Sequence, residues 1–519
     1  MQIAKTPINS GIEVSIAQKL ARLEEIFLVP GASCFPLSVN FFKPDEGFDR
    51  YEGLILEQPD AELVSLLVSC AESISSLNHE AVDYFLARLG ERASPRGTTV
   101  QRVAAYFTEA FAFRAVRLFP HMFSIAPPRE LTYHIEEYSD DDDDGATALR
   151  LFNYVSPIPK FLHFTLNERL LQAFDGKERV HVIDFDIKDG LQWPSLLQSL
   201  ASRPNPPSHV RITGIGKYRE NLQDAGVRLA RFAEALNLPF KFHAVVERLD
   251  DVRLWMLHVK RDECVAVNCV LVMHKLLSDV SGGALRRFLE LIRSTNPSIV
   301  LLGEQEDENN EQRWEVRFGK SLQYYSAIFD SLDSLLPENS ALRIKVEEMF
   351  AREIRNIVAW EGSERVERHE SFRRWREIME NGGFRNLDIG EREMAQSQTI
   401  VRMYSSENFT VERQGEGEGY RGLTLKWLDQ PLYTVSAWAP NEPAHDQFGT
   451  KIWIGHVEMR ENARKEGRLR EMDGLETGVS MGWARMSLKN WVLVFHSKRA
   501  KDENPTAKHA AWGQETPSP

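Results

Sequence analysis

The stretch from residue 180 to residue 216 constrains the fold more than any other part of the chain. Residues 180–185 form a short apolar run, rich in β-branched side chains, which fits a buried strand better than a helix. Pro194 suits the first turn of a helix, because the backbone N–H that proline lacks has no partner there. A second β-branched run follows at residues 210–215. The sequence therefore predicts a strand–helix–strand unit with two parallel strands.

Ligands of such a unit bind beyond the carboxyl end of its first strand. That place holds four charged residues: Asp184, Asp186, Lys188 and Asp189. A dinucleotide or methyl-donor site needs a glycine-rich turn there and an acidic residue at the end of the second strand. This turn contains one glycine, Gly190, and the second strand ends in the uncharged residues 213–216. We therefore expect a nucleotide-binding scaffold without the residues that hold a cofactor.

The rest of the chain predicts an α/β fold with a helical region in front of it. Residues 61–118 carry apolar residues at helical spacing, which indicates amphipathic helices. From residue 175 onward, strands alternate with helices of ten or more residues, a pattern typical of a mostly parallel sheet with helices on both faces. Two strands around a turn at residues 429–431 would close the sheet. We expect a Rossmann-like (methyltransferase-like) sheet with an N-terminal helical cap.

The chain divides into three parts. Residues 1–57 contain scattered prolines and predict a short, weakly ordered leader. Residues 58–439 form one domain, with the helical cap at 58–130 and the α/β core with helical insertions at 175–439. In residues 440–519 the charges nearly cancel and most apolar residues are isolated, so we interpret them as an atypical tail, for which disorder is one interpretation.

The composition excludes several classes of protein. The net charge of −13 does not favour nucleic acid as a partner of the whole chain, although a local basic patch is compatible with it. Four cysteines (Cys34, Cys70, Cys264 and Cys269) are too few for a disulfide framework and lack the spacing of a metal site, so we expect free thiols. The sequence shows neither a secretory signal nor a membrane-spanning apolar run. We expect an intracellular protein without membrane contact.

Leu63, Leu66 and Leu67 form an LxxLL pattern within the expected cap. On a helix these leucines share one face, and such a face can insert into the groove of a partner protein. The alternative is that they pack inside the cap, where leucines at this spacing are common. We treat them as candidate partner-binding residues, and their exposure decides between the two interpretations.

A second candidate surface is an expected helix at residues 364–379 that is dense in arginines. These are Arg365, Arg368, Arg373, Arg374 and Arg376. The glutamates interleaved with them indicate a salt-bridged face in contact with water. The alternative is a surface that contacts the phosphates of DNA, with an affinity that falls steeply as the salt concentration rises.

Two acidic clusters are interpreted as solvated. Five adjacent carboxylates at residues 140–144 would repel one another in a buried site, so a loop is expected there, with a Ca²⁺ site as the alternative. A second cluster follows an expected strand: Glu304, Glu306, Asp307 and Glu308. Metal binding is again the alternative, but we expect a solvated turn.

Several motifs in order resemble those of the plant-specific GRAS family of transcriptional regulators. Residues 180–184 match its VHIID motif, residues 267–277 its VNC and HKLL segments, and residues 436–438 its SAW motif. Two leucine-rich regions match at residues 63–113 and 222–238. The residues that carry the family motifs are His181, Asp184, Gln192, Trp193, Asn268, Arg352, Glu353, Trp427 and Trp438.

The resemblance implies a nuclear regulator of transcription in plant growth and development that works through protein–protein contacts. Its partners would be transcription factors and, in a homo- or heterodimer, GRAS proteins, and it would reach DNA directly or through those partners. Residues 303–307, 349–353 and 368–372 are most similar to the dwarf-and-low-tillering type of scarecrow-like protein, which implies a role in brassinosteroid signalling. The resemblance implies no enzymatic activity, cofactor or metal, and its motif residues would mostly maintain a rigid platform.

The alternative is a methyltransferase-like enzyme or small-molecule-binding protein. It would use Asp184, Asp186 and Asp189 around a cofactor. The missing glycines and the missing acidic residue for a ribose argue against this alternative.

Overall fold

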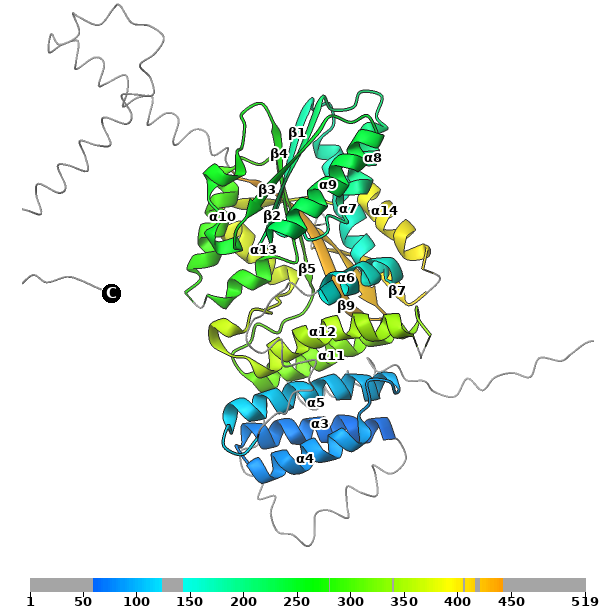
Figure 1. Cartoon of the computed structure of the whole chain (residues 1–519), viewed down its shortest axis with the longest axis vertical. Helices are drawn as coiled ribbons and strands as arrows, with labels where there is room; N and C mark the ends of the chain where they lie inside the picture. The colour runs from blue at the N-terminus through cyan, green and yellow to red at the C-terminus, as the bar shows by residue number, and fades with distance from the viewer. Residues whose placement is uncertain are drawn as a thin grey trace, which may run out of the picture. The chain divides into compact units, whose positions relative to one another are not determined.

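The structure is a computed structural model that describes residues 59–123, 143–279, 281–337, 340–404, 407–415 and 421–441. All of them belong to one unit of the chain, which ends at Ala444. The expectations for the leader, for the tail beyond residue 441 and for the first residues of the acidic run at 140–144 lie outside the described residues. Figure 1 shows the described residues as a helical cap below an α/β core.

A sheet of nine strands forms the core. Its order is β3-β2-β1-β4-β5-β9-β8-β7, and β6 pairs with β9 beside this path. Strands β1 to β5 run parallel, whereas β9 runs antiparallel to β5, and β6, β7 and β8 continue the antiparallel part. The strands are β1 (Arg179–Asp184), β2 (His209–Gly216), β3 (Phe240–Val246), β4 (Cys264–Val270), β5 (Ile299–Gln305), β6 (Phe384–Leu387), β7 (Phe409–Gln414), β8 (Gly422–Trp427) and β9 (Gln430–Pro440). The Rossmann-like prediction is confirmed.

Helices cover both faces of the sheet. Successive strand residues point to opposite sides of the sheet, so the apolar residues of each strand pack against helices on both faces. In β1, Val182 joins a core with helices α7, α8 and α9, whereas Ile183 joins a second core with α10 and α13. The helices of the α/β core are α6 (Asp143–Val155), α7 (Pro157–Ala173), α8 (Trp193–Ala201), α9 (Arg219–Ala235), α10 (Gly283–Ser294), α13 (Phe372–Asn381) and α14 (Glu391–Arg402). Short 3₁₀ helices are η2 (Leu249–Asp251), η3 (Leu254–Leu257), η4 (Met273–Ser278) and η5 (Gly362–Glu364). Burial on both faces explains why the parallel strands are nearly continuous apolar runs.

The cap is a group of three helices that packs on a helix pair between it and the sheet (Figure 1). The cap helices are α3 (Pro59–Ser75), α4 (His79–Arg92) and α5 (Thr99–Leu118), and the pair is α11 (Trp314–Asp333) and α12 (Ala341–Ala359). Thr98 and Gln101 form a capping box, which fixes the start of α5. Phe107 and Phe111 of α5 pack against Phe318 of α11, with ring centroids 5.6 and 5.0 Å apart. Aromatic contacts of this kind join the cap to the rest of the domain.

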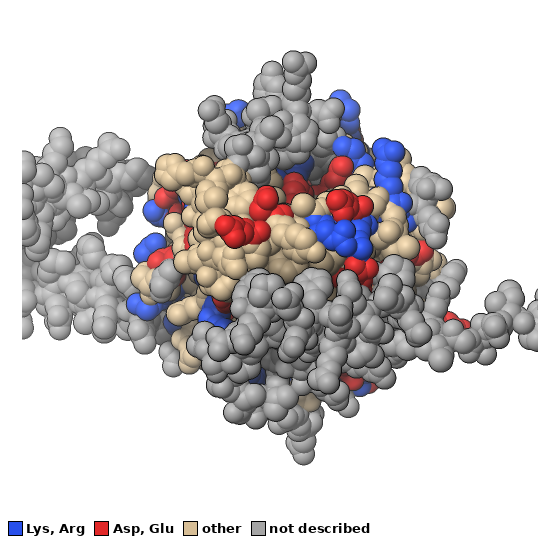
Figure 2. Space-filling view, turned by 90° about the horizontal axis from the view of Figure 1, so that it is seen from below, with Lys and Arg blue, Asp and Glu red and all other residues tan. Residues whose placement is uncertain are grey.

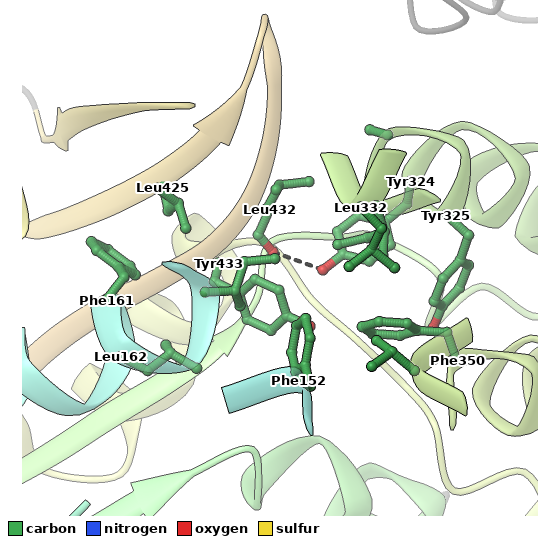
Figure 3. Close-up of a cluster of buried hydrophobic side chains, with 14 of the residues drawn as sticks. Phe152, Phe161, Leu162, Tyr324, Tyr325, Leu332, Phe350, Leu425, Leu432 and Tyr433 are labelled. Atoms are coloured by element: carbon green, nitrogen blue, oxygen red, sulfur yellow. Dashed lines mark hydrogen bonds between the residues drawn. The ribbon is translucent and has the colours of Figure 1, made fainter. Parts of the chain in front are cut away.

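Aromatic and leucine side chains also join the helix pair to the sheet (Figure 3). The hydroxyl of Tyr324 on α11 donates a hydrogen bond of 2.9 Å to the carbonyl oxygen of Leu432 on β9. Phe152 of α6 packs edge-on against Phe350 of α12, with ring centroids 5.3 Å apart. The cluster therefore ties α6, α11, α12 and β9 together.

Two expected helices differ from the structure. The arginine-rich helix expected at residues 364–379 begins only at Phe372. Before it, Arg365 and Arg368 turn inward and donate hydrogen bonds to backbone carbonyl oxygens, which the sequence pattern alone does not reveal. The sequence also predicts a helix at residues 250–258, where the structure has the two 3₁₀ turns η2 and η3.

Candidate functional site

The carboxyl ends of β1 and β4 bring three motif residues into one hydrogen-bonded group. Asp184 of β1 lies beside Asn268 of β4 in the parallel register. The Asp184 carboxylate accepts a hydrogen bond of 3.3 Å from Nδ2 of Asn268 and one of 2.9 Å from Nε1 of Trp193. Burial raises the pKa of Asp184 to about 7, although both hydrogen bonds lower it. This carboxylate fastens α8 to two strands.

Gln192 extends the group toward α7. Its Nε2 donates to Oδ1 of Asn167 and its Oε1 accepts from Nδ2 of Asn268, both at 3.1 Å. Asn167 donates in turn to the backbone oxygen of Gln192 and to Oγ of Ser195, both at 2.9 Å. The sequence alone does not indicate a role for Asn167, because this residue lies in a separate helix, 25 residues before Gln192. These amides are partners of one another, as in a structural network.

His181 is buried in a second polar group on the same strand. Its Nδ1 lies 3.0 Å from Nη2 of Arg211, and its Nε2 lies 2.8 Å from Oγ1 of Thr213. Arginine only donates, so Nδ1 of His181 accepts and Nε2 carries the proton. Burial and then the charge of Arg211 lower the pKa of His181 to about 2, so the ring is neutral. Arg211 also pairs with the buried Glu263, and His181 therefore supports an internal ion pair.

Side chains nearly fill the crevice beyond β1. A cavity of about 80 Å³ remains, lined by residues of β1, β4, α6, α7 and α8 among others. Pockets for small-molecule ligands have volumes of about 300 Å³ or more. A Cβ atom on Gly214 would lie 2.8 Å from Cγ2 of Ile187, so this glycine makes room for Ile187 at the end of β2. The space does not fit a dinucleotide or methyl-donor cofactor.

Asp189 fastens two helices across the mouth of this crevice. Its carboxylate accepts two hydrogen bonds from Arg150 of α6, at 2.8 and 3.0 Å. Arg228 of α9 donates a third, at 3.2 Å. The charge of Asp189 is therefore matched by two arginines of the protein itself.

Glu304 in β5 and Asp307 after it are buried, which corrects the expectation of a solvated turn for these two residues, whereas Glu306 is half-buried and Glu308 is exposed. Glu304 is 2% exposed and Asp307 is 8% exposed. One oxygen of Glu304 lies 2.7 Å from Nδ1 of His274, and the other accepts from two backbone N–H groups at the start of η4. Glu306 accepts from the backbone N–H of Phe372 and caps α13. Protein groups therefore bind these carboxylates, where water would bind them in a solvated turn.

Glu367 and His369 complete the group around His274, and the sequence alone indicates no role for them. His274, Glu304 and His369 offer ligand atoms that all lie within 4.8 Å of one another. These residues come from η4, β5 and the segment before α13. Nothing in their spacing along the chain indicates that they meet.

The LxxLL leucines are part of the cap's interior. Leu63 and Leu67 are 3% and 1% exposed, and Leu66 is half-buried against the same core. The leucine face of α3 packs within the domain, so it is not free to enter the groove of a partner. The alternative interpretation, core packing, is the correct one.

The exposed apolar residues of the cap are different ones. We define the cap face as Leu77, Tyr84, Leu118 and Met122, each 41–60% exposed. Figure 2 views the molecule from the cap side, where uncharged residues cover wide areas and charged groups gather in small clusters. The cap therefore presents apolar side chains to solvent, although not those of the LxxLL pattern.

The arginines of residues 365–376 do not form one surface. Arg365 and Arg368 are buried, which excludes them from contact with DNA phosphates. Arg374 and Arg376 lie on α13 and pair with Glu377 and Glu380 at 2.7 and 3.6 Å, and Arg373 is exposed. The expected salt-bridged face is present on the short helix, and DNA contact by its arginines stays a prediction.

Cys70, Cys264 and Cys269 are free thiols, and Cys34 lies outside the described residues. Among the described residues, no helix has the length and apolar character to cross a membrane.

Comparison with known proteins decides the family. The model of the GRAS domain family matches residues 63–439, which is more than half of the chain. The chain belongs to the GRAS domain family. It is 62% identical over 390 residues to Protein DWARF AND LOW-TILLERING of Oryza sativa subsp. japonica, a match that covers 74% of this chain and 62% of that protein.

Two further relatives support the assignment to the GRAS family. Scarecrow-like protein 28 of Arabidopsis thaliana is 58% identical over 391 residues, or 73% of this chain and 58% of that protein. The crystal structure of SCL7 in Oryza sativa matches with a TM-score of 0.61 and 30% identity, over 72% of this chain and 99% of that chain. This chain spans less than two thirds of the length of the first two relatives.

The remaining motif residues of this GRAS domain also make internal contacts. Trp427 of β8 donates a hydrogen bond of 2.8 Å to Asp330 of α11. Trp438 of β9 is fully buried in the second core. Glu353 accepts hydrogen bonds from side chains of β5 and α11, whereas Arg352 lies on the exposed side of α12. Most motif residues of the family therefore hold the sheet, α8 and α11 in place.

Proposed function

We propose that this GRAS domain regulates transcription in plant growth and development, in the nucleus, by binding other proteins and not by catalysing a reaction. Its family and its similarity to DWARF AND LOW-TILLERING and Scarecrow-like protein 28 support the regulatory role. The observation that carries the binding role is the cap face, where four large apolar side chains lie in contact with water. We also propose brassinosteroid signalling as its setting, on the resemblance of residues 303–307, 349–353 and 368–372.

The chemistry of the cap face favours a protein partner. Full burial of a large apolar side chain stabilises a complex by about 1.5–3 kcal/mol, so a partner that covers several of them gains affinity. We propose transcription factors and a second GRAS domain as the partners that cover these side chains. The net charge of −13 opposes direct contact of the whole chain with DNA, so we propose that DNA is reached mainly through these partners.

A reporter assay in plant protoplasts tests this function. The full chain is fused to a heterologous DNA-binding module, and co-purifying transcription factors are identified by mass spectrometry. The test variant, Tyr84→Glu with Met122→Glu, places two charges on the cap face. The matched control, Trp255→Glu, replaces an exposed tryptophan in η3, which belongs to the α/β core and not to the cap.

We expect the cap variant to lose reporter regulation and the transcription factors, while the control retains both and all three proteins unfold at the same temperature. A cap variant that regulates like the wild type would refute docking at the cap face. A wild-type fusion that neither changes the reporter nor enters the nucleus would refute the regulatory function itself.

A further inference from the structure

Two histidines and two glutamates meet in a buried place behind the carboxyl end of β5. We call His274, Glu304, Glu367 and His369 the His–Glu cluster. His274 and His369 are 3% and 1% exposed, Glu304 is 2% exposed, and the side chain of Glu367 is 17% exposed. The two imidazole rings lie against each other, with centroids 4.5 Å apart and planes tilted by 40°. The elements that bring them together are η4, β5 and the segment before α13.

Two interatomic distances in the His–Glu cluster match the separation of ligand atoms around a tetrahedral metal ion. Nε2 of His274 lies 3.1 Å from Oε2 of Glu367, and Nε2 of His369 lies 3.3 Å from the same oxygen. Zn²⁺ binds imidazole nitrogen and carboxylate oxygen at about 2.0–2.1 Å, which separates neighbouring ligand atoms of a tetrahedron by about 3.3–3.4 Å. Two histidines and one glutamate are a ligand set that zinc accepts.

Glu304 stands where metal-binding histidines usually have a carboxylate. Its Oε2 lies 2.7 Å from Nδ1 of His274, the ring nitrogen that faces away from Glu367. Its other oxygen is fixed by the backbone N–H groups of Val272 and Met273, at 3.1 and 2.8 Å. Such an outer carboxylate orients the ring and leaves Nε2 free to bind the metal.

His369 provides an independent sign of a missing ligand. It is almost completely buried, yet neither of its ring nitrogens makes a hydrogen bond within the described part of the chain. Its contact with Glu367 at 3.3 Å lacks hydrogen-bond geometry. A buried polar group without a partner destabilises the folded state, and a bound cation would remove that cost.

The charge in this place is also negative. The carboxylates of Glu304 and Glu367 lie on opposite sides of the His274 ring, 2.7 Å from Nδ1 and 3.1 Å from Nε2. A divalent cation would balance the charges of both carboxylates.

We propose that the His–Glu cluster binds one divalent transition-metal ion of the Zn²⁺ class, with Nε2 of His274, Nε2 of His369 and Oε2 of Glu367 as ligands. Glu304 orients His274 from the outer side. The site is structural in character, because it is enclosed and joins the segment before α13 to η4 and β5. The proposal does not depend on the regulatory function.

Zinc titration of the full chain tests the proposal. The protein is dialysed against a chelator and then titrated with ZnCl₂ in competition with a chromophoric chelator, and Co²⁺ replaces zinc in a parallel sample for its visible spectrum. The test variant is His369→Gln, which removes a ligand from a side chain that makes no hydrogen bond. The matched control is His121→Gln, at an exposed histidine beyond α5.

We expect one zinc ion per chain, a tetrahedral Co²⁺ spectrum, and at least 100-fold weaker zinc binding by His369→Gln, while His121→Gln binds like the wild type. Thermal unfolding of the wild type with and without zinc gives a second measurement, and zinc should raise its midpoint. The proposal is overturned if the wild type binds no zinc, or if a folded His369→Gln binds it equally well.

Discussion

Replacing Arg102 by methionine should weaken the attachment of the cap more than any exposed substitution on α5. Arg102 is 1% exposed and donates hydrogen bonds of 2.9 Å to Glu347 of α12 and 2.6 Å to Asp333 of α11. Methionine preserves much of the side-chain volume but removes the charge. It leaves the fully buried Glu347 with Arg343 as its remaining cation, 3.5 Å away.

Removal of one partner from a buried ion pair costs about 3–5 kcal/mol, because an uncompensated charge stays behind. Since Arg343 still compensates part of the charge on Glu347, we expect Arg102→Met to lower the free energy of unfolding by about 3 kcal/mol, the lower end of this range. The matched control is Arg117→Met, which removes an arginine of the same helix from an exposed pair with Glu364. Exposed pairs contribute about 0–1 kcal/mol.

The assay is urea denaturation followed by circular dichroism, at pH 6 and pH 8. Burial raises the pKa of Glu347 from 4.5 to about 7 in the folded wild type. Its protonated form is therefore favoured in the folded state, and this contribution to stability is lost as the pH rises through about 7. Without Arg102 the pKa rises further, so the deficit of the variant should be larger at pH 8 than at pH 6. A loss no larger than that of Arg117→Met, or one independent of pH, would refute this account of the cap attachment.

Three further predictions concern the cap and the crevice. Leu67→Ala should lower the free energy of unfolding, measured by urea denaturation, by about 2–5 kcal/mol, because it opens a cavity in the cap. Ser65→Ala, on the exposed side of the same helix, should lower it by less than about 0.5 kcal/mol. Equal losses would contradict the burial of the LxxLL pattern. Burial raises the pKa of Asp184 from 3.8 to about 7, so its ionisation opposes folding as the pH rises through 7. The free energy of unfolding of Asp184→Asn, relative to that of the wild type, should therefore rise by up to roughly 4 kcal/mol between pH 4 and pH 8. A difference that stays constant with pH would contradict this. Calorimetric titration with S-adenosylmethionine should detect no binding in the micromolar range, because the crevice holds about 80 Å³, and micromolar binding that Asp184→Ala abolishes would revive the enzyme alternative.

The sequence predicts the parallel half of the fold well, because burial on both faces leaves a direct trace in it. The apolar run at residues 180–185 is strand β1, and its neighbour in the sheet, β4, has the same character. The turn after β1 contains a single glycine, from which the sequence predicts a crevice without a cofactor site. In the structure Ile187 packs against Gly214 beside this crevice.

Some buried charged residues cannot be placed from the sequence. The sequence predicts that Glu304 and Arg365 face solvent, because charged residues are rarely buried without partners. Their partners are backbone groups and histidines from distant segments, and no local pattern indicates those contacts. Leu63 and Leu67 do form a local pattern, but that pattern is equally compatible with a helix that docks on a partner and with a helix that packs in the core. Only the three-dimensional contacts of α3 separate the two.

The position of the cap has a consequence for the synthesis of this protein. The ribosome makes Arg102 of α5 well before its partner Glu347, which follows 245 residues later. At about 5–20 residues per second, that interval lasts roughly 10–50 s, during which the apolar side of the cap has no α11 or α12 to cover it. The edge of β5 likewise stays open until β9 emerges, because Val300 pairs with Trp438. Chaperones that shield nascent chains should therefore contact the cap segment and release it only after α12 has left the ribosome.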